Sequence, residues 1–388
     1  MNNKLVLNIL YIVPTRDWST RERIAFRDIL AAKQEGHNVF ICTYEDSPFA
    51  KLARARSHEI IPFKEHFLNN IITFYKHFSL KSIFKKVKID IIHCYELNLL
   101  LSLSFQLKTE SLVPLIVTQD HLIDRPLQRF WYKPLISRID ALIMINKNLK
   151  QDIRGNLDIP LKKIEYFGMG LYQEPSLAEE QIPVNFSLYK DYFLAGTYIS
   201  PECADIEIIT PLLSALKVLN EKNSCGKKNK LVFLSIVDFK SIAVLPEIMR
   251  LVQEQQLEED VLFVSTQDVS SVVSYFNIWI SNRANELIED YAISAIFNEV
   301  PALFPRNFCT RDFLEEYVGV GETYKLYDAR ELRDKWERIL LGNALFKEKT
   351  RLYKYYIERE HSYKTYRMKL LGIYSSSFLR RDRLFNRK

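Results

Sequence analysis

Short runs of β-branched and aliphatic residues alternate with helical patterns through the first half of the sequence. Because these runs are apolar at nearly every position, they predict strands of a parallel sheet that is covered on both faces. After the first run, Ser19 and Glu22 fit a capping box, and the apolar stripe from Ala25 to Leu30 predicts a helix that stops at Gly36. The six runs begin at Leu5, Asn38, Ile89, Pro114, Ala141 and Lys163.

A second series of the same kind follows the polar stretch from Glu174 to Val184. Its runs begin at Tyr192, Lys230, Val261, Asn277, Pro301 and Glu322, and helices are predicted over 205–221, 242–256, 286–298 and 329–341. We therefore predict an α/β fold of two doubly wound, Rossmann-like parallel sheets in tandem, as the length of 388 residues allows. The expected divisions are an N-terminal domain over 1–183, a C-terminal domain over 184–345, and a basic helix or tail over 346–388 that packs back on the N-terminal domain.

The composition of the chain excludes several common kinds of binding site. Ten residues are Gly, and they form neither G-x-G-x-x-G nor G-x-x-x-x-G-K-[ST], so a bound phosphate needs other contacts. The five Cys are widely spaced and no C-x-x-C or H-E-x-x-H is present, which predicts reduced thiols and no metal site. No apolar run is long enough to span a membrane, and the first residues read as a core strand instead of a signal peptide. We therefore expect a cytoplasmic protein.

Positive charge is concentrated at the C-terminal end. The whole chain has a net charge of +6, yet residues 345–388 carry 13 Lys and Arg against 4 Asp and Glu. Such a tail is either a site for an anionic partner or a solvated helix. The segment 69–88 mixes Phe and Ile with Lys, which is typical of helices on anionic membranes and also of amphipathic helices that cover a sheet. Peripheral binding at the inner face of a membrane stays open, whereas no nucleic acid is expected, because no aromatic stacking motif is present.

Several segments follow one another in a characteristic order. In the first half they are EGHNVFICTYED from Glu35, KIDIIHCYEL from Lys88, PLIVTQDH from Pro114, RIDALIMINKNLKQDI from Arg138 and IPLKKIEYFGMGLYQEP from Ile159. In the second half they are YFLAGTYISPECADIEIITPLLSALKVL from Tyr192, VLFVSTQDVSSVVSYFNIWISNRANE from Val261 and the block from Glu286 to Pro301. Up to about residue 345, the chain resembles the GT-B-fold retaining glycosyltransferases of group 1, similar to family 4, which use nucleotide-sugar donors.

The resemblance implies a donor site in a cleft between the domains, on the side of the C-terminal domain. The family places an Arg and a Lys near the diphosphate, and the matching stretch here, which begins Gly196, Thr197, Tyr198, has neither cation. The family also has two Glu eight residues apart, one for the sugar and one for the ribose. Glu286 matches the first, and Ser294 stands at the second. A Ser hydroxyl lacks the charged, bidentate acceptor that suits a ribose diol, so the donor-site motifs are degenerate.

Further positions bear on the phosphates and the sugar. Where the family has a Gly pair after its first strand, this chain has Arg16 and Ser19, which offer a cation and a helix N-terminus to an anion. Arg306 follows a strand of the second domain and is either a phosphate ligand or a solvated loop side chain. His121 and Asp120 follow the fourth run, where the family often holds the donor sugar, although a loop His with a local partner is the alternative.

Structural and functional roles also compete at the end of the third run and at Glu286. His93 and Glu96 end the third run, and a structural role for each competes with a place in the cleft. Glu286 also suits a helix start for purely local reasons, because a carboxylate is favourable at the positive end of a helix. The resemblance favours the sugar contact for Glu286.

Two functions fit these residues. The first is a hexosyltransferase of polysaccharide or glycolipid biosynthesis, which moves a sugar from a nucleotide-sugar donor to a glycan or lipid-linked acceptor without a metal or cofactor. Glu286, His121 and Asp120 would be its catalytic residues. The second is a GT-B relative without catalysis that serves as a partner subunit or glycan-binding module. The missing cations motivate the second, because positive groups stabilise the leaving diphosphate.

Overall fold

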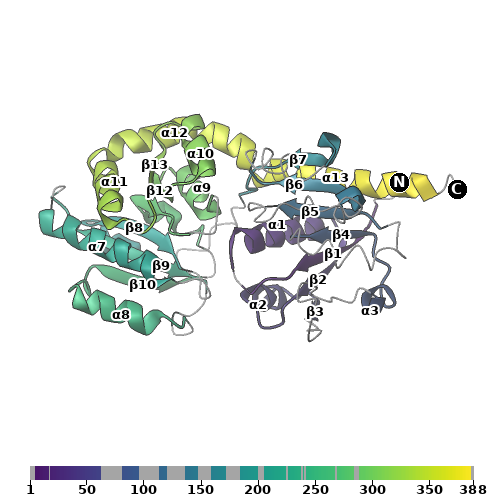
Figure 1. The fold of residues 1–388 in the computed structure, drawn as a ribbon, viewed down its shortest axis with the longest axis horizontal. Coiled ribbons are helices and arrows are strands. Elements are labelled where there is room, and N and C mark those ends of the chain that lie inside the picture. Colours follow the sequence, from purple (N-terminus) through teal and green to yellow (C-terminus); the bar gives the residue numbers. More distant parts are fainter. Residues whose placement is uncertain are drawn as a thin grey trace, which may run out of the picture. The chain divides into compact units, whose positions relative to one another are not determined.

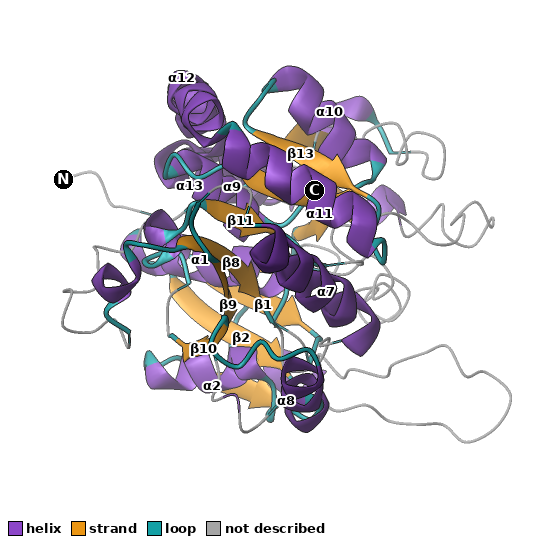
Figure 2. Ribbon diagram, turned by 90° about the vertical axis from the view of Figure 1, so that its left-hand side faces the viewer, coloured by secondary structure: helices purple, strands orange, loops and turns teal. Residues whose placement is uncertain are grey.

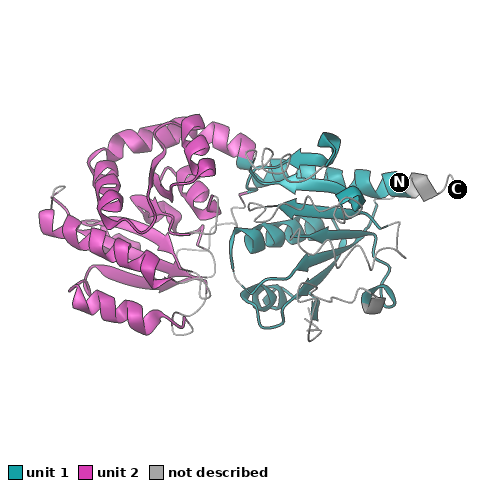
Figure 3. Ribbon diagram, in the orientation of Figure 1, with its two compact units in different colours: residues 1–170, 361–388 teal, residues 171–360 magenta. Residues whose placement is uncertain are grey.

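The computed structural model describes residues 5–16, 18–62, 81–95, 113–119, 136–146, 159–171, 184–199, 205–223, 226–236, 239, 242–266, 269–283 and 288–385. The chain divides into two compact units (Figure 3). Unit 1 comprises residues 1–170 and 361–388, and unit 2 comprises residues 171–360. The tail expected over 346–388 is thus shared between the units, with its last helix in unit 1.

Unit 1 is built on a parallel sheet of seven strands in the order β3-β2-β1-β4-β5-β6-β7 (Figure 1). All six predicted apolar runs of this half form strands, which confirms the doubly wound sheet. The short strand β3 was not predicted. The strands are β1 Asn8–Val13, β2 Asn38–Thr43, β3 Ile60–Pro62, β4 Ile91–Cys94, β5 Leu115–Gln119, β6 Ile139–Met144 and β7 Ile164–Tyr166.

Helix α1 (Thr20–Gln34) begins where the capping box predicts. The Ser19 side chain accepts a hydrogen bond from the Arg21 backbone N–H, and the Ser19 backbone N–H donates to Glu22 Oε2 at 2.7 Å. Both ends of the box therefore satisfy N–H groups that the first turn leaves without partners. The other helices described in unit 1 are α2 Pro48–Ala55, α3 Lys81–Phe84 and α13 Tyr363–Phe385.

The C-terminal helix α13 belongs to unit 1, where it packs against α1 (Figure 1). Arg381 makes a bidentate ion pair with the buried Asp140 of β6, with both N···O distances at 3.0 Å. Arg367 pairs with Glu35 at the end of α1 at 3.0 Å. Charge pairs along its length therefore hold the basic helix on its own unit.

Unit 2 is built on a parallel sheet of six strands in the order β10-β9-β8-β11-β12-β13. All six predicted runs of the second half form strands, so the second doubly wound sheet is also confirmed. The strands are β8 Phe193–Tyr198, β9 Asn229–Ser235, β10 Val261–Ser265, β11 Ile278–Ile280, β12 Ala302–Pro305 and β13 Gly321–Tyr324. Gly321 pairs with Ala302, and a Cβ at Gly321 would lie 2.0 Å from the Ala302 carbonyl oxygen, so this register needs glycine.

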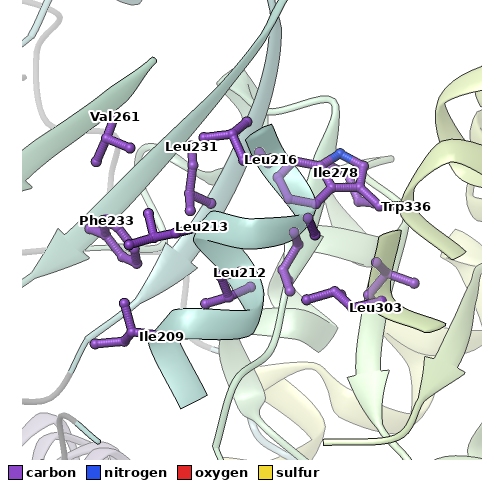
Figure 4. Packing of buried hydrophobic residues seen from close by; sticks show 14 of the residues in the cluster. Ile209, Leu212, Leu213, Leu216, Leu231, Phe233, Val261, Ile278, Leu303 and Trp336 are labelled. Carbon is purple, nitrogen blue, oxygen red and sulfur yellow. The ribbon is translucent and has the colours of Figure 1, made fainter. Parts of the chain in front are cut away.

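The four helices predicted in the second half are present, and α10 is an addition that was not predicted. The helices are α7 Ile206–Lys222, α8 Leu245–Glu254, α9 Asp290–Phe297, α10 Phe308–Glu316, α11 Ala329–Leu341 and α12 Asn343–His361. Helices α7 and α11 lie side by side and cover one part of the sheet (Figures 1 and 2). The core beneath them holds Leu213 and Leu216 of α7, Leu231 and Phe233 of β9, and Trp336 of α11 (Figure 4).

Candidate functional site

Each sheet contains one point at which the strand order reverses. In unit 1 the sheet continues from β1 to β2 on one side and from β1 to β4 on the other, and in unit 2 β8 stands in the same way between β9 and β11. Ligands of doubly wound sheets bind outside the carboxyl ends of the strands at this switch point. The residues that follow β1 and β4, and those that follow β8 and β11, are therefore the candidates for binding.

In unit 2 the two strands of the switch point are tied together near their ends. Gly196 of β8 pairs with Trp279 of β11. The Thr197 hydroxyl donates a hydrogen bond to the Ile280 carbonyl oxygen at 2.7 Å, and the Thr197 side chain is fully buried. A Cβ at Gly196 would lie 2.6 Å from the ring of Phe276, so the strand needs glycine here to let that ring pack. Close packing thus accounts for two residues that were expected to bind the donor.

Tyr198, the third residue expected in this stretch, is also buried. Its ring lies 5.1 Å from the ring of Tyr291 on α9, in an edge-to-face arrangement. The side chains of Thr197 and Tyr198 both serve the interior of the unit.

Polar side chains gather at the start of α9, beside the end of β11. Glu289, Asp290 and Ser294 are all buried, and Trp279 Nε1 donates to Glu289 Oε2 at 3.3 Å. The Tyr324 hydroxyl donates to the Ser281 carbonyl oxygen at 2.7 Å, and burial together with the Glu289 charge raises the pKa of Tyr324. Ser294 thus stands in the second turn of α9, within a polar region that the sheet covers.

Three members of this region were missed from the sequence: Arg283, Glu289 and Asp290. Arg283 comes three residues after β11 and is 6% exposed. A signal was available, because polar side chains that directly follow a buried parallel strand lie at the ligand-binding edge. Arginine is seldom buried to this extent, so its burial directly after β11 makes it a candidate for a specific role.

Arg306 follows β12 and is engaged in an ion pair. Its guanidinium contacts Glu331 of α11, and its side chain is half exposed. Asn307 caps α10 by accepting a hydrogen bond from the Thr310 backbone N–H at 2.9 Å. Structural roles therefore explain both Arg306 and Asn307 in the loop after β12.

At the switch point of unit 1, the side chains after β1 contact the protein itself. Arg16 Nη1 lies 2.9 Å from Asp46 Oδ2, and the guanidinium stacks on the ring of Tyr44. The hydroxyl of Ser19 donates to the Glu22 carboxylate, which also accepts from the Ser19 backbone. Burial raises the pKa of Glu22, against the effect of nearby Arg21 and of these hydrogen bonds. The Glu22 carboxylate thus binds at the N-terminus of α1, which was expected to bind phosphate.

His93, at the end of β4, belongs to a buried polar network. Its Nδ1 lies 2.8 Å from the Tyr374 hydroxyl of α13, and its Nε2 lies 2.8 Å from the Thr118 hydroxyl of β5. The Tyr95 hydroxyl donates to Asp28 of α1, and Asp28 Oδ2 lies 3.7 Å from His93 Nδ1. These side chains connect two strands to α1 and α13. The network supports the structural role for His93 and not the alternative of a place in the ligand site.

Burial dominates the ionisation of this network. It raises the pKa of Asp28 to about 7, although the hydroxyls of Tyr366 and Tyr95 and the charge of Arg27 act in the opposite direction. Burial also lowers the pKa of His93 to about 3. At pH 5 the folded pair therefore carries a neutral carboxyl and a neutral imidazole.

Glu286, His121, Asp120 and Glu96 lie outside the described residues, as do most of residues 69–88. Among the described residues, no group of three or more His, Cys, Asp or Glu side chains is arranged to hold a metal ion. The described helices include none with the length and apolar character needed to cross a membrane. Cys42, Cys94 and Cys309 are buried free thiols.

The chain is similar to known proteins in part of its sequence and in its structure. Residues 25–171 match the model of Glycosyltransferase Family 4. No curated protein sequence matches the chain. A glycosyltransferase from Rickettsia africae has a similar structure, with 15% identity, a TM-score of 0.71, and coverage of 96% of this chain and 98% of that one.

Two further solved structures are similar. Anabaena HepE in complex with UDP and glucose has 13% identity and a TM-score of 0.69, over 95% of this chain and 100% of that one. WaaG, a glycosyltransferase involved in lipopolysaccharide biosynthesis, has 13% identity and a TM-score of 0.64, over 94% and 99%. At these identities the likeness establishes the fold. The chain therefore has the GT-B fold, and its residues 25–171 match the model of Glycosyltransferase Family 4.

Proposed function

We propose that this protein transfers a sugar from a nucleotide-sugar donor to a glycan or lipid-linked acceptor, with retention of configuration and without a metal ion. The observation that carries the proposal is the polar region at the switch point of unit 2, in a chain with the GT-B fold. The similar HepE binds UDP and glucose. The donor nucleotide would lie outside the carboxyl ends of β8 and β11.

The proposed roles follow the chemistry of the leaving group. When the bond between the anomeric carbon and the diphosphate breaks, negative charge grows on the diphosphate, and donors aimed at that charge lower the barrier. Backbone N–H groups after Gly196 would contact the phosphates, and Ser294 would give the ribose one hydroxyl contact. Glu286, His121 and Asp120 would act on the sugar.

Binding of nucleotides tests the proposal. We expect UDP, GDP or ADP to bind the full chain with a dissociation constant below about 1 mM in calorimetric titration. The matching nucleotide-sugar should be hydrolysed slowly and equally well with and without EDTA. Glu286→Gln should reduce hydrolysis by about 100-fold and leave nucleotide affinity unchanged, because its proposed contact is with the sugar. Glu207→Gln, an exposed change near the start of α7, serves as the control.

The result that contradicts the proposal is equally clear. If no nucleotide binds at millimolar concentration, the chain is a GT-B relative without catalysis, which acts as a partner subunit or glycan-binding module. The absence of the family's Arg and Lys after β8 is the observation that favours this second function, since losing one such donor costs several kcal/mol of transition-state stabilisation.

We propose further that the acceptor lies at an anionic membrane surface. Helix α12 presents apolar side chains outward, with Leu345 58%, Leu352 59% and Tyr355 66% exposed. Leu345 and Leu352 are seven residues apart and share one face of the helix. Arg359 stacks over the nearby Tyr356, and residues 345–388 carry a strong excess of Lys and Arg. Leu and Tyr beside basic side chains are typical of surfaces that bind anionic lipid headgroups.

Flotation with liposomes measures this attachment. We expect the full chain to float with vesicles that contain anionic lipid at low salt and to stay unbound with zwitterionic vesicles. The double variant Leu345→Glu and Leu352→Glu should reduce flotation at least about fivefold, since it removes apolar contact and adds negative charge. Leu188→Glu, at a site 76% exposed and far from α12 in the sequence, is the matched control. Equal flotation of the two variants would refute a role for α12.

A further inference from the structure

The sequence after β8 supplies no positive charge to the proposed donor site. The strand order indicates which other residue could supply it. In the resembled family this loop supplies the cations for the diphosphate, but the stretch from Gly196 to Ala204 contains none. A diphosphate of two or more negative charges needs a positive partner in a site that excludes water. We therefore asked which other cations the sheet brings to this edge.

The strand order restricts the choice. In the sheet order β10-β9-β8-β11-β12-β13, the two neighbours of β8 are β9 and β11. The described residue directly after β9 is Ile236, which carries no charge. Arg283 follows β11, whereas Arg306 and Lys325 follow β12 and β13, which are farther from β8. Among the described residues that directly follow the two strands next to β8, Arg283 is the cation.

The surroundings of Arg283 differ from those of Arg306. Arg306 is half exposed and is bound to Glu331. Arg283 is 6% exposed and stands between the β11 end and the buried start of α9. A guanidinium shielded from water interacts more strongly with an anion than one at the surface, because the local dielectric constant is lower. Its planar fork also matches two phosphate oxygens.

We propose that Arg283 is the cation that binds the β-phosphate of the donor and replaces the missing Arg and Lys. The proposal rests on the proposed sugar transfer. In that reaction the bond between the anomeric carbon and the β-phosphate oxygen breaks, and its electron pair stays on the nucleoside diphosphate. A bond then forms from the same carbon to the acceptor oxygen, whose proton passes to the diphosphate or to water. Arg283 donates hydrogen bonds to the phosphate oxygens throughout and exchanges no proton.

A structural role is the competing explanation. The buried carboxylates Glu289 and Asp290 follow in the same segment, and a buried Arg that only neutralises them would matter for folding but not for nucleotide recognition. The two roles differ in one measurable property. If Arg283 binds phosphate, a substitution at residue 283 weakens the affinity for a nucleoside diphosphate more than the affinity for the nucleoside. If its role is only structural, the substitution changes both affinities alike.

The test compares Arg283→Gln and Arg283→Lys with the unchanged full chain. The titrants are the nucleoside diphosphate that the unchanged chain binds and the corresponding nucleoside. Arg283→Gln should weaken diphosphate binding about 10- to 100-fold, as expected for a hydrogen bond between charged groups, with nucleoside affinity within about twofold. Arg283→Lys should recover part of the loss, since it restores the charge without the fork. Arg311→Gln, an exposed change on α10, should have no effect.

Thermal unfolding shows first whether each variant is folded. Should Arg283→Gln not fold, hydrogen exchange of the unchanged chain decides: the diphosphate must slow exchange in residues 277–289 more than the nucleoside does. Equal protection, or a folded Arg283→Gln that keeps the normal preference for diphosphate, overturns the assignment and leaves sugar transfer intact. If the unchanged chain binds no nucleotide, both proposals fall.

Discussion

Replacing Trp336 by Ala is expected to lower the free energy of unfolding of unit 2 by about 3–5 kcal/mol. Trp336 is fully buried on α11 and packs in the core shared with α7 and the sheet (Figure 4). Removal of the indole takes away a large apolar surface and leaves a cavity, because the surrounding backbone relaxes only in part. Unit 2 would then unfold at a clearly lower denaturant concentration.

Two further variants separate the cause of this effect. Among the described residues, Trp336 Nε1 has no hydrogen-bond partner, so Trp336→Phe loses less than Ala and also removes a buried polar group. Leu341→Ala, at a site 65% exposed on the same helix, should change stability by less than about 0.5 kcal/mol. Because the chain has two units, unfolding is best followed by hydrogen exchange of unit 2 peptides in denaturant. A loss below about 1 kcal/mol for Trp336→Ala would contradict the packing described.

Replacing Asp28 by Asn is expected to make unit 1 sensitive to acid. In the folded chain, burial raises the pKa of Asp28 from 3.8 to about 7 and lowers that of His93 from 6.5 to about 3. The Asp28 contribution is therefore present at low pH and is lost as the pH rises through about 7. The His93 contribution is present above about pH 6.5 and is lost as the pH falls toward 3.

The two contributions change with pH in opposite directions between about pH 4 and 6.5, so they nearly cancel in the natural chain. The other ionisable groups that face the pair leave this balance unchanged. Burial raises the pKa of each tyrosine around it, so the phenols stay neutral over this range. The tyrosines are Tyr11 of β1, Tyr95 after β4, and Tyr366 and Tyr374 of α13.

Asp28→Asn removes only the contribution that offsets His93. At pH 4.5 the variant should be close to the natural chain, since Asn resembles the neutral carboxyl that Asp28 carries there. Between pH 4.5 and about 6.5 its stability should rise with pH by on the order of 1 kcal/mol per pH unit, to roughly 3 kcal/mol above the natural chain at pH 7.5. Denaturation at pH 7.5, 6.0 and 4.5, followed by hydrogen exchange of unit 1, measures this. Glu45→Gln, an exposed control, should show no such trend, and parallel curves for Asp28→Asn would refute the coupling.

Most of the fold was predictable from periodicity and caps. The helix predicted over 329–341 is α11 to the residue, and α1 begins after Ser19 as its capping box indicates. The misses have local causes. Strand β3 is three residues long, too short for a periodic signal, and α10 is capped by Asn307 with Thr310 instead of the Glu or Gln that marks a capping box.

The candidate site was predicted less completely, because the partners of its side chains lie far away in the sequence. Arg16 reaches Asp46 and Arg306 reaches Glu331, so both expected phosphate ligands have internal partners. Arg283 was not singled out, since its burial depends on strands and a helix that pack around it. No pattern along the sequence predicts ion pairs between residues so far apart.

Apolar runs, caps and motif order were sufficient to predict two parallel α/β sheets of the GT-B kind, because this property depends on local periodicity and on the order of segments. The burial of Arg283, the occupation of the α1 N-terminus by Glu22, and the anchoring of α13 through Tyr374 and His93 emerged only from the folded chain. The physical reason is that burial and pairing of charges depend on distances between residues that the fold brings together from remote parts of the sequence.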